Sequence, residues 1–61
     1  MTEILDFPAT LKKIQETETT VYRAAYALAA RQALADARRA LGAGAYGLAV
    51  QWCEAAKDLA T

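Results

Sequence analysis

Residues 38–44 read RRALGAG, and this stretch decides the fold because it ends one helix and turns the chain toward another. Its two arginines place positive charge in a last helical turn, where the helix dipole is negative. Gly42 then follows Leu41, the usual place for a left-handed residue that caps a helix. Residues 42–44 are therefore predicted to form a short turn that makes the flanking helices antiparallel neighbours.

The helix before this turn is predicted to run from about residue 8 to residue 41, after a lead-in over residues 1–7. Pro8 suits a first helical turn, where a missing N–H costs nothing, and Asp6 is chemically a better cap than Phe7. Four β-branched side chains between residues 17 and 21 lower the helix propensity there. We favour one continuous helix, and the alternative is a break near residues 17–20.

A second helix is predicted over residues 45–60, which gives an all-α antiparallel helical hairpin in a single domain over residues 1–61. An ordinary surface helix is apolar over an arc a little wider than a third of a turn. Here the polar residues of the second helix fall on one stripe, and nearly everything else is apolar; the first helix is similar after residue 20. Because a soluble monomer rarely exposes a large apolar patch, we expect a homo-oligomer, a dimeric four-helix bundle.

The residues predicted to form the core and the interface lie on the apolar rows of the two helices. Trp52 is expected to be buried, filling the space that alanines at positions 33 and 37 leave on the first helix. The full set is Val21, Tyr22, Tyr26, Leu28, Ala33, Leu34, Ala37, Leu41, Tyr46, Leu48, Trp52 and Leu59.

The size of the chain also favours association. A domain of about 60 residues buries only about 60% of its unfolded surface and is marginal alone. Cys53 is the only cysteine and histidine is absent, so neither an internal disulfide nor a structural zinc site is expected. Oligomerisation or partner binding is then the remaining way to stabilise it, and no cofactor is predicted.

No catalytic constellation is visible in the sequence, and we predict that the protein is not an enzyme. Without histidine the commonest general base is missing. Cys53 lies within the apolar face, where a small buried hydrophobe is its simplest interpretation. The turn at residues 42–44 lacks the longer glycine pattern and the lysine of a phosphate-binding loop.

A nucleic-acid-associated regulator is the alternative function, because arginines recur along the first helix. This predicted basic patch comprises Arg23, Arg31, Arg38 and Arg39. Seven positive charges are nevertheless balanced by seven negative ones, so no global attraction to nucleic acid is expected, and nucleic acid is not the favoured partner.

No membrane association is predicted either. The longest apolar stretch, residues 24–30, is far shorter than the ~20 residues that a membrane span requires. The N-terminus lacks the basic region of a secretory signal, and with the lone cysteine this favours a reducing, cytoplasmic setting.

The stretch over residues 44–49, followed by Cys53, Ala56 and Leu59, resembles the turn and second helix of a tetratricopeptide repeat. In that family a Gly, a Tyr and two Ala recur at these spacings. The resemblance covers about 16 residues and implies a helical hairpin that binds a protein partner. The upstream helix departs from the pattern at Asp36 and Ala37. The sequence as a whole predicts a small non-enzymatic interaction protein, regulatory or inhibitory, that acts through apolar helix faces.

Overall fold

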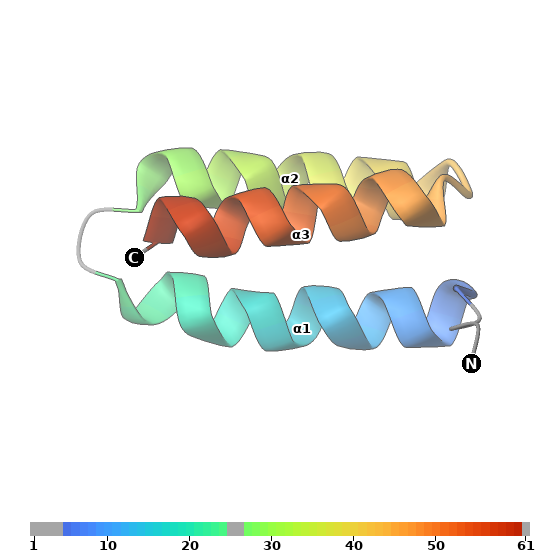
Figure 1. Ribbon diagram of the computed structural model, residues 1–61, viewed down its shortest axis with the longest axis horizontal. Helices are drawn as coiled ribbons and strands as arrows, with labels where there is room; N and C mark the ends of the chain where they lie inside the picture. The colour runs from blue at the N-terminus through green and yellow to red at the C-terminus, as the bar shows by residue number, and fades with distance from the viewer. Residues whose placement is uncertain (1–4, 25–26, 61) are drawn as a thin grey trace.

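The computed structural model describes residues 5–24 and 27–60, which form three helices and no strand. Helix α1 spans Phe7–Arg23, α2 spans Leu28–Gly42 and α3 spans Tyr46–Ala60. Helices α1 and α3 run in the same direction and α2 runs in the opposite one, and α2 and α3 lie side by side (Figure 1). The all-α prediction is confirmed, whereas the prediction of a two-helix hairpin is wrong, because the predicted first helix is divided in two.

The division follows Arg23 and does not fall near residues 17–20. Ala24 has an extended backbone, and Ala27 precedes α2 without a side-chain cap. The threonines are accommodated inside α1: Thr17 donates its hydroxyl hydrogen to the Lys13 carbonyl at 2.8 Å, and the hydroxyls of residues 19 and 20 likewise donate one turn back.

Tertiary burial explains a break among residues that are good helix formers. If residues 7–42 formed one straight helix, Ile14 and Val21 would be too far from the buried residues of α2 and α3 to pack against them. Folding α1 back against α2 and α3 leaves both side chains with no exposed surface. Burial of an apolar face contributes more to helical stability in proteins than local propensity does, so the chain gives up a few helical hydrogen bonds to gain it.

The start of α1 is formed as the sequence predicts. The Ala9 N–H donates to the Asp6 carboxylate at 3.0 Å, and the Thr10 N–H donates to the Asp6 carbonyl at 3.0 Å. Asp6 is therefore the N-terminal cap, and Pro8 lies in the first turn.

The turn between α2 and α3 is closed by Gly44, whereas the prediction placed the left-handed residue at Gly42. Gly44 has a φ of +77°, and Gly42 is the last residue of α2. The Ala45 N–H donates to the Ala40 carbonyl at 2.9 Å and the Gly44 N–H to the Leu41 carbonyl at 3.1 Å. This pair of bonds is the Schellman motif, which needs its left-handed residue two positions later than predicted.

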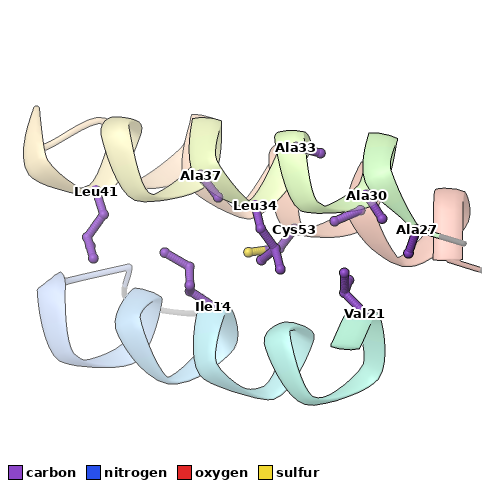
Figure 2. Packing of buried hydrophobic residues seen from close by; sticks show 10 residues of the cluster. Ile14, Val21, Ala27, Ala30, Ala33, Leu34, Ala37, Leu41 and Cys53 are labelled. Carbon is purple, nitrogen blue, oxygen red and sulfur yellow. The ribbon is translucent and has the colours of Figure 1, made fainter. Parts of the chain in front are cut away.

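Small side chains make up most of the core between the three helices. From α1, Ile14 and Val21 point toward α2, and Cys53 of α3 lies among the residues between them (Figure 2). The buried cluster consists of Ile14, Val21, Ala27, Ala30, Ala33, Leu34, Ala37, Leu41, Cys53 and Ala56. Because alanine and cysteine make up most of what α2 and α3 contribute to this cluster, these two helices approach closely and leave little room for large residues between them.

Candidate interaction surface

The predicted core and interface residues divide into two groups in the single chain. Buried are Val21, Ala33, Leu34, Ala37 and Leu41, with Tyr46 partly buried against the same cluster. Exposed are Tyr22, Leu28, Leu48, Trp52 and Leu59. Tyr26 lies outside the described residues.

Trp52 is not among the buried residues of the single chain, because 36% of its surface is exposed. The prediction that Trp52 is buried is therefore wrong for the chain alone. The physical reason is the close approach of α2 and α3: the alanines at positions 33 and 37 are covered, and Ala49, Cys53 and Ala56 form the buried row of α3.

Large apolar side chains gather on a second row of α3, beside its buried row. Leu48 is 48% exposed and Leu59 is 52% exposed, with Trp52 between them and a half-buried Ala55 completing the row. We call these four residues the α3 stripe. Their spacings of four, three and four residues keep them on one side of a helix, in the a and d pattern of a coiled-coil seam.

Ala55 is absent from the core and interface residues that the sequence predicts. The signal that finds it is the same spacing: Ala55 stands three residues after Trp52 and four before Leu59. Ala55 is smaller than the other three members, yet its position makes the row continuous.

The other exposed large apolar residues lie on other parts of the chain. Leu5 and Phe7 stand at the start of α1, and Leu28, 72% exposed, is the first residue of α2. Tyr22 of α1 lies beneath the guanidinium of Arg31, whose central carbon is 5.2 Å from the ring centroid. An arginine over an aromatic face at this distance makes a cation–π contact, so this ring is already partly covered.

Three of the four arginines in the predicted basic patch contact other side chains of the same chain. Arg38 forms an ion pair with Glu18 of α1, and Arg39 approaches Asp36 one turn back, at 3.6 Å between nitrogen and oxygen. Arg31 lies on Tyr22, as described above. Arg23 is exposed at the end of α1. Glu18 and Asp36 therefore offset the charge of two of the four arginines.

Cys53 is buried in the core, with Thr17 of α1 near its thiol. Burial raises the pKa of the Cys53 thiol above its ordinary value, which outweighs the opposite effects of Thr17 and of the nearby Lys57. A nucleophilic cysteine needs a lowered pKa and access to solvent. This thiol has neither, so its geometry is that of a packing residue.

Within residues 5–24 and 27–60, no group of three or more His, Cys, Asp or Glu side chains is placed to hold a metal ion. None of the helices in this part of the chain combines the length and the apolar character that crossing a membrane would require.

Comparison with known proteins returns no match: neither a protein-family model, nor a curated protein, nor a solved structure is similar to this chain. The resemblance of residues 44–59 to a tetratricopeptide unit rests on its sequence spacing alone.

Proposed function

We propose that this protein is a small, non-enzymatic interaction protein of a regulatory or inhibitory kind, which acts through the α3 stripe and associates with itself. One observation supports this most: three large apolar side chains of α3 remain about a third to a half exposed, while alanines occupy the core beside them. Full burial of a Leu or similar side chain is worth about 1.5–3 kcal/mol. Covering the stripe with another apolar surface would recover the part of this stabilisation that the single chain forgoes.

The placement of the exposed residues also favours this function over a random scatter. Single exposed apolar side chains are normal on soluble proteins, and Leu28 is such a case. In contrast, Leu48, Trp52 and Leu59 share one side of one helix. An apolar helix face with this spacing is the kind of element that docks against another helix or into a groove.

A nucleic-acid-associated regulator is less well supported. A phosphate-binding surface needs several arginines or lysines free to approach the backbone. Arg38 and Arg39 are in ion pairs with Glu18 and Asp36, and the chain carries no net charge.

The lone buried Cys53 suits the reducing cytoplasm, which we propose as the cellular setting of the protein.

Site-specific photocrosslinking in the source cells tests the proposal. A photoreactive amino acid replaces Leu59 in one variant and Leu28 in the other, so that each reports on a different exposed leucine. We expect covalent adducts from position 59 and few from position 28. Equal yields from both positions, or no adduct from position 59, would contradict the proposed role of the α3 stripe.

A further inference from the structure

The α3 stripe has a spacing that reads the same in both directions along the helix. From Leu48 the steps are four residues to Trp52, three to Ala55 and four to Leu59. Leucines stand at both ends, and the two inner positions carry the largest side chain and the smallest. Such a row can pack against a copy of itself, provided that the second copy runs the opposite way.

An antiparallel pairing about a two-fold axis matches the sizes of these side chains. Each Leu48 would lie opposite Leu59 of the second copy, and each Trp52 opposite Ala55 of the second copy. A large residue then meets a small one at both central positions, which is how facing helices interdigitate without voids. A two-fold axis makes both contacts identical, as in most homodimers.

A parallel pairing of the same stripes is much less favourable. It would place Trp52 against Trp52 and Ala55 against Ala55, so one layer would be overfilled and the next would contain a void. Overpacking forces side chains out of their preferred rotamers, and an unfilled cavity destabilises as well. The order of large and small residues along the stripe therefore selects the antiparallel arrangement.

The charges of the chain do not oppose self-association. Seven positive and seven negative residues cancel, so two copies carry no net repulsion. Beside the stripe, the antiparallel arrangement brings the Gln51 amide near the Asp58 side chain of the second copy. The sequence thus places an amide, and no second carboxylate, at that edge.

We propose that the partner covering the α3 stripe is a second copy of this chain, packed antiparallel about a two-fold axis, with Trp52 set against Ala55 of the second copy. This inference rests on the proposed function, because it names the partner of the same surface. It also predicts a specific register, which a docking site for an unrelated protein would not require.

Exchanging the two central residues tests that register. The single variant Ala55→Trp places tryptophan opposite tryptophan and should abolish the dimer. The double variant Trp52→Ala/Ala55→Trp restores one large and one small residue at each contact. We expect sedimentation equilibrium to give twice the 6.6 kDa chain mass for the parent and the double variant, and 6.6 kDa for Ala55→Trp.

A second pair of variants keeps the test valid if a tryptophan variant fails to fold, which helical circular dichroism would reveal. Leu59→Glu places a charge in the seam and should yield a folded monomer, whereas Leu28→Ser, on the most exposed leucine of α2, should remain a dimer. A double variant no more dimeric than Ala55→Trp would overturn the register. A parent that stays monomeric at high micromolar concentration, or a dimer that survives Leu59→Glu, would overturn self-association through the stripe. Crosslinks from position 59 to a different protein would then support the interaction role of the α3 stripe without its self-association.

Discussion

Replacing Ile14 with alanine tests whether α1 docks on the other two helices. Ile14 has no exposed surface and lies in the cluster with Leu34, Leu41 and Cys53. Removing three carbons at about 0.8 kcal/mol each forfeits roughly 2.4 kcal/mol, and the cavity left behind brings the cost into the range of about 2–5 kcal/mol. Because a domain of this size gains only about 3–5 kcal/mol from its core, we expect Ile14→Ala to be largely unfolded.

Urea denaturation followed by helical circular dichroism measures this effect. Two variants calibrate it: Ile14→Val should cost about 0.5–1.5 kcal/mol, and Leu28→Ala, on a side chain that is 72% exposed, should change stability by less than about 0.5 kcal/mol. If Ile14→Ala unfolds at the same urea concentration as the parent, α1 does not pack against α2 and α3. The reasoning about the break after Arg23 would then be refuted.

Three further predictions concern the turn, the buried hydroxyls and the thiol. Gly44→Ala should lower the free energy of unfolding by about 1–2 kcal/mol, because Gly44 has a φ of +77° that alanine rarely adopts. Gly47→Ala, within α3, should raise the free energy of unfolding by up to about 1 kcal/mol. Thermal melts in which Gly44→Ala is the more stable variant would contradict this. Thr10→Val removes a buried hydroxyl that has no hydrogen-bond partner among the described residues and should be neutral or stabilising. Thr17→Val loses its hydrogen bond to the Lys13 carbonyl and should cost about 1 kcal/mol in urea titrations. Burial raises the pKa of the Cys53 thiol in the folded state, so the unfolded thiol ionises at a lower pH than the folded one. The parent should therefore lose more stability than Cys53→Ala as the pH rises from neutral through about 8.5, the ordinary pKa of a cysteine; parallel pH profiles would contradict the burial.

Local signals in the sequence predicted the ends of the helices better than their number. The Asp6 cap and the start of α1 near Pro8 follow from side-chain chemistry within one helical turn. The second predicted helix, residues 45–60, corresponds to α3 at Tyr46–Ala60. Such features depend on residues close together in the sequence, so the sequence itself is enough to predict them.

The break after Arg23 could not be predicted in the same way. Ala24 and Ala27 flank the break, although alanine has the highest helix propensity of all residues. The threonines at positions 17, 19 and 20, where a break was considered, lie inside α1. The decision is made by contacts between residues far apart in the sequence, such as Val21 with the alanines of α2. Helix propensity contains no information about those contacts.

The candidate surface shows a similar limit. Periodicity placed Leu48, Trp52 and Leu59 on the apolar part of the second predicted helix. That apolar part is wider than one neighbouring helix can cover, and the sequence does not show which residues on it stay exposed. The closely packed alanines of α2 and α3 decide that, because they leave the larger residues at the margin of the core.

The fluorescence of Trp52 as a function of protein concentration shows whether association covers the α3 stripe. Trp52 is the only tryptophan and is 36% exposed in the single chain, so its emission reports on the stripe alone. We predict that the emission maximum moves to shorter wavelength as the concentration rises from nanomolar to high micromolar, and that Leu59→Glu holds it at the dilute value. An emission maximum that shifts equally in both proteins, or in neither, would contradict association through the α3 stripe.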